Sequence, residues 1–255
     1  MTLKQWINKA VTRAASNAGY EILPQWKFDR QPLVRHLQKL FLLHKIDCVF
    51  DVGGNLGQYR DLLRQDVGFK GWILSFEPVT KYISILQERA KHDAHWRIFD
   101  YALGSTEQTS TIHVTKSPGL NSFLSPRTDI VDGFWQDNSI THDETVKIHR
   151  LDTIYPGLKT QLQFESVYLK IDTQGYDLEV IKGASEVMRD IRSMQTEASL
   201  LPLYEGMPTH DAVRTCLANH GFDISGMYSV SIDDQMRLIE YDCILINSKY
   251  RQKYN

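Results

Sequence analysis

The stretch from Ile46 to Gly57 constrains the fold more than any other part of this sequence. An apolar run ends at Asp51, and the glycine-rich turn Val52-Gly53-Gly54-Asn55-Leu56-Gly57 follows it. A helical pattern begins directly after the turn, at Gln58. Strand, tight turn and helix in this order are typical of the first unit of an α/β nucleotide-binding fold. The glycines lack the G-x-G-x-x-G spacing that places a pyrophosphate on a helix N-terminus, which argues against a dehydrogenase.

The acid at this turn indicates a ligand with positive charge. Asp51 places a carboxylate where an anion would be repelled, whereas a ligand with an ammonium and a sulfonium group, such as S-adenosylmethionine, suits it. We therefore expect Asp51, Gly53 and Gly57 at a cofactor site. For Asn55 two roles stay open, a left-handed turn conformation or a hydrogen bond to the amino-acid tail of the cofactor.

Strand and helix patterns alternate along the rest of the chain. This order predicts an α/β fold with a doubly wound, mostly parallel sheet and a C-terminal antiparallel hairpin. We divide the chain into an N-terminal helical extension (1–44) and a single domain (45–255) with an inserted lid segment at about 105–150. The expected core strands are 46–50, 72–76, 96–99, 167–172 and 193–197, with the hairpin at 222–230 and 241–247 and added strands at 109–115 and 145–149. Between the added strands, the polar residues 116–142 predict a long loop.

Composition narrows the function classes. The 255 residues include only three, widely separated cysteines, which favours reduced thiols in a cytoplasmic protein. No apolar run is long enough to span a membrane. Residues 1–70 carry 11 Lys/Arg against 6 Asp/Glu, and the remainder carries 18 against 25, which argues against a nucleic-acid channel through the body of the protein. The basic helical segment 1–18 leaves open a peripheral membrane contact, or packing on the domain or on a second subunit of a homodimer.

Five expected strands end in or beside an acid. These residues are Asp51, Glu77, Asp100, Asp172 and Glu197. One such acid is commonly a helix cap, but five along one sheet edge would repel one another without a cationic ligand or a metal. Glu77 follows Asp51 at close to the offset of roughly 20 residues at which an acid accepts both ribose hydroxyls of an adenosine.

The other strand ends divide between the adenine and the acceptor. We expect Asp100, Tyr101 and Ala102 to hold the adenine. Asp172 is the first candidate for the base that accepts a proton from an acceptor hydroxyl, and Glu197 is the second. A third candidate is His142, in the expected loop over the site.

Metal binding stays an alternative. Paired carboxylates suit Mg²⁺, but the spacing shows no third oxygen ligand, so no metal site is predicted.

These residues at this spacing resemble the FkbM family of S-adenosylmethionine-dependent methyltransferases. The resemblance covers residues 45–247 or so and includes Gly183-Ala184 and the strand of Glu197. The motifs that carry it are Asp51 to Gly57, Phe76-Glu77-Pro78, Ala102-Leu103-Gly104, Asn121 to Leu124, Arg150 to Ile154 and Leu169 to Tyr176. Three positions differ from the family pattern: Gly54 is often alanine, Gln174 is commonly glutamate, and Asp177 is usually glutamate.

The resemblance implies a class I, Rossmann-like methyltransferase fold and O-methylation of an alcohol, with a sugar or glycan hydroxyl as our preferred acceptor. A Mg²⁺-dependent methyltransferase of a polyketide, antibiotic or nucleotide-sugar hydroxyl is one alternative. A non-catalytic protein that binds S-adenosylmethionine is another, although acids on the acceptor side argue against it.

Overall fold

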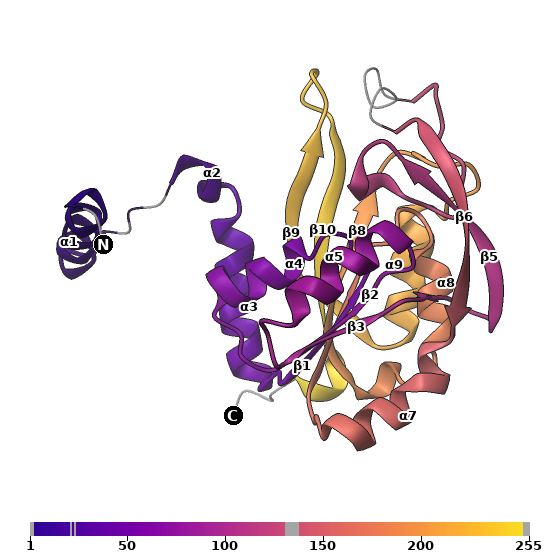
Figure 1. Ribbon diagram of the computed structural model, residues 1–255, viewed down its shortest axis with the longest axis horizontal. Coiled ribbons are helices and arrows are strands. Elements are labelled where there is room, and N and C mark those ends of the chain that lie inside the picture. The colour runs from indigo at the N-terminus through magenta and orange to yellow at the C-terminus, as the bar shows by residue number, and fades with distance from the viewer. Residues whose placement is uncertain (1–2, 21, 23, 131–137, 252–255) are drawn as a thin grey trace.

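The computed structural model describes residues 3–20, 22, 24–130 and 138–251 (Figure 1). Its centre is a seven-stranded sheet in the order β3-β2-β1-β7-β8-β10-β9. All neighbouring strands are parallel except β10, which is antiparallel to both β8 and β9. The strands are β1 (Cys48–Val52), β2 (Trp72–Phe76), β3 (Trp96–Phe99), β7 (Val167–Ile171), β8 (Ile191–Ser199), β9 (Phe222–Ile232) and β10 (Leu238–Asn247). The predicted mostly parallel sheet with a terminal antiparallel hairpin is therefore confirmed.

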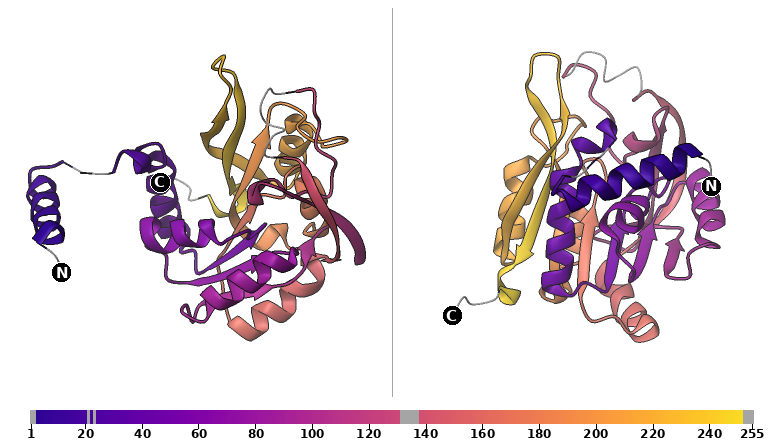
Figure 2. Two further views of the ribbon diagram at one scale, coloured as in Figure 1. Left: turned by 45° about the horizontal axis from the view of Figure 1, so that its top comes forward. Right: turned by 90° about the vertical axis from the view of Figure 1, so that its left-hand side faces the viewer.

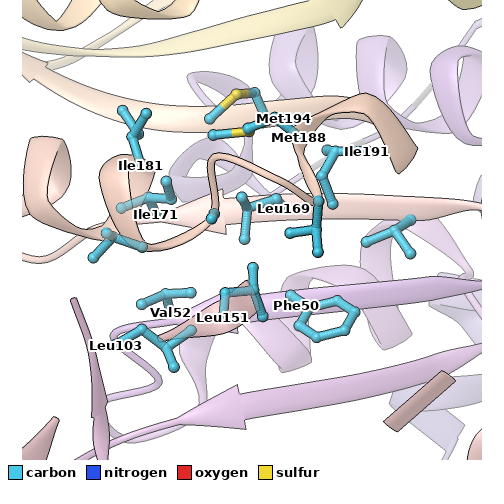
Figure 3. Close-up of a cluster of buried hydrophobic side chains, with 14 of the residues drawn as sticks. Phe50, Val52, Leu103, Leu151, Leu169, Ile171, Ile181, Met188, Ile191 and Met194 are labelled. Carbon is cyan, nitrogen blue, oxygen red and sulfur yellow. The ribbon is translucent and has the colours of Figure 1, made fainter. Parts of the chain in front are cut away.

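Helices cover both faces of this sheet because side chains alternate along each strand. Val49 on β1 packs with α3 (Gln31–His44), η1 (Leu62–Val67) and α5 (Thr80–Ala90). Its neighbours Cys48 and Phe50 point to the opposite face. There they pack with α7 (Leu151–Leu162), α8 (Asp177–Gly183) and α9 (His210–Asn219), and Figure 3 shows part of this cluster. The sheet is therefore doubly wound.

The strand order places a switch point at the centre of the sheet. The chain moves from β1 outward to β2 and β3, and then returns to add β7 on the other side of β1. In open α/β sheets, ligands bind beyond the carboxyl ends of the strands at such a point. The turns after β1 and β7, which carry Gly53 and Asp172, therefore lie where a ligand is expected to bind.

A second, three-stranded sheet lies beside α5. It has the order β4-β6-β5, with β4 (Ala102–Leu103), β5 (Gln108–Thr115) and β6 (Ile140–His149), and the short helix η2 (Pro118–Leu120) follows β5. Ile112, Val114 and Val146 pack against Val79 and Tyr82 at the start of α5. The strand β6 begins five residues before the predicted 145–149. Residues 131–137 of the predicted lid lie outside the described part of the chain.

The remaining short elements lie at the N-terminus, after β1 and at the C-terminal side. Helices α1 (Leu3–Asn17) and α2 (Gln25–Phe28) precede α3, and α1 lies away from the sheet (Figures 1 and 2). The helix α4 (Gln58–Asp61) leads into η1, whereas η3 (Met188–Asp190) and η4 (Ser248–Tyr250) flank β8 and β10. In the described chain, every helix is too short or too polar to cross a membrane. The predicted membrane or subunit contact of residues 1–18 stays a prediction.

Candidate functional site

The turn after β1 needs glycine at position 53. Gly53 has φ +83°, and a Cβ built there would lie 2.0 Å from the carbonyl oxygen of Asp172, which an alanine could not tolerate. The amides of Gly53 and Gly54 both donate to the carbonyl of Phe76, at 3.0 Å. The turn is thus pressed between the ends of β2 and β7, and it brings its backbone close to any ligand above the sheet.

Asn55 and Glu77 form the next part of the site. Asn55 has φ +47°, and its backbone amide donates to Glu77 Oε2 at 2.7 Å. Glu77 Oε1 accepts a second backbone hydrogen bond, from Val79 at 2.9 Å. Burial raises the pKa of Glu77 to about 7, although these two amides act against the shift. The Oδ1 atom of Asn55 is buried and has no hydrogen-bond partner within the protein. Such an orphaned acceptor indicates a ligand that carries a donor.

A narrow cavity of about 90 Å³ lies over these residues. Its walls come from the turns after β1, β2 and β7, from β4, and from the segment around η2. The lining residues are Val52, Gly53, Asn55, Phe76, Glu77, Pro78, Ala102, Leu103, Ile112, Pro118, Gly119, Asn121, Ser122, Phe123, Asp172, Thr173 and Gln174. Among the residues expected to hold adenine, only Ala102 is in this wall.

The other two expected adenine contacts, Asp100 and Tyr101, lie elsewhere. Asp100 is exposed to solvent in the turn after β3. The ring of Tyr101 packs against His149, at 4.5 Å between ring centroids, and against Phe99 at 5.7 Å. Neither residue lines the narrow cavity, because only β4 returns to its wall, and their contact with an adenine stays a prediction.

Asp51 is buried below the turn and faces a cation of the protein itself. Lys170 Nζ lies 3.3 Å from Asp51 Oδ1 and 3.4 Å from Asp172 Oδ2, and it donates to the Gly53 carbonyl at 3.1 Å. Ser75 Oγ donates to the other Asp51 oxygen at 2.8 Å. Burial raises the pKa of Asp51, and Lys170 opposes that shift. Asp51 lines neither cavity of the site, and its direct contact with a cofactor stays a prediction.

Lys170 keeps its charge in spite of its position. Burial lowers its pKa, but the carboxylates of Asp172 and Asp51 together raise the pKa above the ordinary value. The ammonium therefore links the buried acid below the turn to the accessible acid above it. Lys170 and Asp172 lie two residues apart along the chain and share a face, which allows this ion pair.

Gly57 allows close packing and does not line the cavity. It has φ +83°, and a Cβ there would lie 2.9 Å from both the Trp96 ring and the Arg89 guanidinium. It therefore lets α4 start against Trp96, which is fully buried. Gly57 lies on the side of the turn that packs on Trp96 and Arg89, and its expected ligand contact stays a prediction.

A wider cavity of about 550 Å³ adjoins the narrow one at Gly53, Asn55 and Asp172. Polar side chains dominate its wall. The complete lining is Asp29, Arg30, Leu33, Gly53, Gly54, Asn55, Gln58, Tyr59, Leu62, Lys170, Asp172, Gln195, Glu197, Tyr228, Ser229, Val230 and Asp242. The two candidate bases Asp172 and Glu197 thus share one cavity, and that cavity meets the one containing Glu77.

Glu197 and Asp242 lie opposite each other on β8 and β10. Burial, and then the nearby Asp172, raise the pKa of Glu197 well above its ordinary value. Burial raises the pKa of Asp242 to about 6. Gln195 donates to Asp242 at 2.7 Å and accepts a hydrogen bond from Tyr59 at 2.8 Å. The wider cavity therefore has a wall of carboxyl groups that hold protons more readily than free ones do.

His142 is not part of this site. It lies on β6, with its side chain half exposed, and its Nε2 pairs with Glu144 at 3.1 Å. Glu144 in turn accepts the backbone amide of Thr80 at the start of α5. The expectation that His142 lies in a loop over the cavity is wrong, because residues 140–149 form a strand whose inner face packs on α5.

A sequence profile of the FkbM methyltransferase domain matches residues 51–224. This chain belongs to the FkbM methyltransferase family. The match begins at the acid that ends the first strand and includes Glu77, Asp172 and Glu197. It stops before β10, which supplies Asp242.

Similar solved structures are distant from this FkbM protein. The methyltransferase FkbM of Methylobacillus flagellatus KT is 14% identical, with 78% of this chain and 43% of that one covered and a TM-score of 0.47. The precorrin-6y C5,15-methyltransferase of Geobacter metallireducens GS-15 is 11% identical, with 88% and 92% covered and a TM-score of 0.43. The magnesium protoporphyrin IX methyltransferase of Synechocystis PCC 6803, solved with bound SAM, is 10% identical, with 87% and 81% covered and a TM-score of 0.43.

This chain spans less than half the length of the Methylobacillus structure. None of the curated proteins matches it.

Two residues of the site were missed by sequence reasoning in this FkbM protein. Asp242 is a single acid inside the apolar run from Tyr241 to Ile246, and this interruption is a signal that could have been read. Gln174 was noted only as a departure from a family glutamate, and nothing local in the sequence shows where its amide points. Among the described residues, no three His, Cys, Asp or Glu side chains are grouped to hold a metal ion.

Proposed function

We propose that this protein transfers a methyl group from S-adenosylmethionine to a hydroxyl group of a sugar or glycan. The observation that carries the proposal is the junction of two cavities at Asn55 and Asp172. One cavity contains a buried carboxyl group suited to a ribose, and the other is wide, polar and lined by acids. A methyl donor and a hydroxyl acceptor need two compartments that meet at the point of transfer.

The residues of the narrow cavity fit the cofactor. Each Glu77 oxygen already accepts one backbone hydrogen bond and has capacity left for one ribose hydroxyl. The unpartnered Oδ1 of Asn55 suits the ammonium of the methionine part. The backbone of Gly53 leaves the space that a Cβ would fill. The cavity of about 90 Å³ is smaller than the roughly 300 Å³ at which ligand pockets begin, so we expect residues 117–123 to move outward on binding.

S-adenosylmethionine supplies a methyl group that is already activated by its sulfonium. The protein has to place the acceptor oxygen in line at about 3 Å and to take up its proton as the bond forms. Asp172 is placed for this role, because it lines both cavities and its Oδ2 lies 3.4 Å from the Lys170 ammonium. The product would be a methyl ether and S-adenosylhomocysteine. The largely polar wall of the wide cavity favours a sugar over an apolar polyketide.

Calorimetric titration with S-adenosylhomocysteine tests the cofactor half. We expect micromolar binding to the wild type and at least tenfold weaker binding to Glu77→Ala. Glu88→Ala is the matched control, since Glu88 is an exposed glutamate on α5. Equal affinity of wild type and Glu77→Ala, or no binding to well-folded wild type, would refute the proposed cofactor site.

Transfer of a tritiated methyl group to a panel of free, nucleotide-linked and lipid-linked sugars tests the acceptor half. We expect product with at least one sugar and a loss of about 10²-fold or more in kcat for Asp172→Asn, the usual range for a general base. Asp211→Asn, at an exposed position on α9, is the control. Turnover of apolar alcohols alone would contradict the sugar assignment.

A further inference from the structure

Gln174 has a strained backbone in the wall of the narrow cavity. It follows β7 in the segment Asp172-Thr173-Gln174-Gly175, with φ +51°, a left-handed value that is uncommon outside glycine. The hydroxyl of Ser122 donates to the Gln174 carbonyl at 2.7 Å and fixes this peptide. Strained residues of this kind persist only where their surroundings enforce them, and they cluster at functional sites.

The side chain of Gln174 bridges the two candidate acids. Its Nε2 donates one hydrogen bond to Asp172 Oδ1 at 3.0 Å and another to Glu197 Oε2 at 2.7 Å. Its Oε1 accepts a hydrogen bond from the hydroxyl of Tyr204 at 2.9 Å. The two acids fix the orientation of the amide, because the opposite orientation would place the amide oxygen against the oxygens of Asp172 and Glu197.

Two carboxyl groups with one space between them are usually joined by a cation or by a shared proton. Here that space holds an amide nitrogen with two hydrogens. A divalent cation needs oxygen ligands, and the two N–H groups offer none. The Gln174 side chain therefore holds the two carboxyl groups together through hydrogen bonds, at a position where a metal ion would hold them through its charge.

We propose that Gln174 is a positioning residue that holds Asp172 and Glu197 together as a metal-free pair for an acceptor with two neighbouring hydroxyls. The proposal rests on the proposed function, since it takes the wide cavity as the acceptor site. Asp172, close to the Lys170 ammonium, accepts a hydrogen bond from the hydroxyl to be methylated. Glu197 retains a proton and donates it in a hydrogen bond to the adjacent hydroxyl.

The burial of Glu197 and the acids around it support this division of roles. They raise the pKa of Glu197, with Asp172 directly after β7, Glu240 and Asp242 on β10 and Asp177 on α8 all acting in the same direction. A 1,2-diol, such as two adjacent hydroxyls on a sugar ring, presents one donor and one acceptor to such a pair. A single isolated alcohol would leave Glu197 without its partner.

The substitution Gln174→Glu gives a test that does not depend on methyl transfer. It replaces the two amide donors with a third carboxylate, so that the introduced side chain, Asp172 and Glu197 together offer oxygen ligands to a divalent cation. We expect Mn²⁺, followed by electron paramagnetic resonance, to bind this variant at least tenfold more tightly than wild type. Gln174→Glu combined with Asp172→Asn is the matched control, and it should return binding to the wild-type level.

Three results would overturn the proposal. A saturable Mn²⁺ site in the wild type that Asp172→Asn removes would show that the amide does not take the place of a cation. Unchanged Mn²⁺ affinity in folded Gln174→Glu would show the same. The third is loss of wild-type methyl transfer in EDTA with recovery in Mg²⁺. The wild-type Mn²⁺ titration decides the question even where Gln174→Glu does not fold.

Failure of every acceptor in the transfer assay would refute the proposed function, and the Mn²⁺ results would still stand. With an active acceptor in hand, the proposal further expects a cis-diol sugar to be methylated at least tenfold faster, as kcat/KM, than its monodeoxy analogue. Equal rates for the two would contradict the role given to Glu197.

Discussion

Replacing Gly53 by alanine gives the most direct test of the structure around the cofactor turn. Gly53 and Gly68 have nearly the same positive φ, +83° and +82°. A Cβ at Gly68 has no heavy atom within 4 Å, whereas a Cβ at Gly53 would lie 2.0 Å from the Asp172 carbonyl oxygen. The pair of variants Gly53→Ala and Gly68→Ala therefore separates the cost of the left-handed backbone from the cost of the collision.

The magnitudes follow from these distances. A left-handed alanine costs roughly 1–2 kcal/mol, and we expect this loss in the free energy of unfolding for both variants. At Gly53 the Asp172 carbonyl must also retreat by about 1.4 Å to reach an ordinary contact of 3.4 Å. Forcing extra atoms into a packed site costs about 1–3 kcal/mol more, so Gly53→Ala should lose about 2–5 kcal/mol in total.

Urea-induced unfolding followed by tryptophan fluorescence measures both losses, because Trp96 is buried in the core beside this turn. The same samples can be titrated with S-adenosylhomocysteine, and only Gly53→Ala should bind it more weakly. Losses of stability that agree within about 0.5 kcal/mol for the two variants would refute the reasoning. The turn would then not be pressed against the end of β7.

Three further variants test the buried charges and the second sheet. Because burial raises the pKa of Glu77 from 4.5 to about 7, the native state binds its proton more tightly than the unfolded chain does, and the wild type should lose stability as the pH rises through this interval. Between pH 5 and pH 8, the free energy of unfolding of Glu77→Gln should fall by about 2–3 kcal/mol less than that of the wild type, as measured by urea unfolding. The same pH dependence in both proteins would show that Glu77 titrates normally. Lys170→Met leaves the carboxylate of Asp51 buried without its ion-pair partner, so we expect a loss of about 3–5 kcal/mol in the free energy of unfolding, measured by thermal and urea unfolding. Adding Asp51→Asn to this variant should restore part of the loss. A double variant that is no more stable than Lys170→Met alone would contradict the ion pair between the two residues. Glu144→Ala removes the acceptor of the Thr80 amide at the start of α5 and should cost about 1 kcal/mol, with Asp143→Ala, at an exposed position beside it, as the control that should lose less.

The arrangement of the sheet was predictable because its signals are local. The apolar runs that end at Asp51 and Asp172 mark strands, and the acids after them mark the edge where the cavities lie. Strand β6 was harder to place, since Ile140 is exposed, residues 141–144 are polar, and this part of the strand pairs only with residues 112–115 of β5. Such a strand lacks the apolar alternation on which prediction depends, and His142 was misplaced for that reason.

The acceptor side of the site depends on contacts between distant parts of the chain. Asp242 reaches Glu197 because β10 returns antiparallel to β8 in a register that sets these two residues opposite each other. Nothing near either residue in the sequence specifies that register. The direction of the Gln174 amide depends likewise on Glu197, which lies 23 residues further along. The periodicity of a sequence predicts which face of a helix or strand is buried, but it does not predict which residues of other elements pack against that face.

The surroundings of Asp51 follow from one piece of information that the sequence lacks, the register between β1 and β7. The parallel register of β1 and β7 sets Asp51 beside Lys170, and residues two apart on a strand share a face, so Lys170 also lies beside Asp172. One register therefore places a lysine between the buried acid and the accessible one. The protein supplies its own cation at the turn, which removes the argument that Asp51 attracts a positively charged ligand. Around the cofactor cavity the acid with the clearer role is Glu77, 5% exposed and with a pKa of about 7, because two ribose hydroxyls that donate to it would stabilise its ionised form.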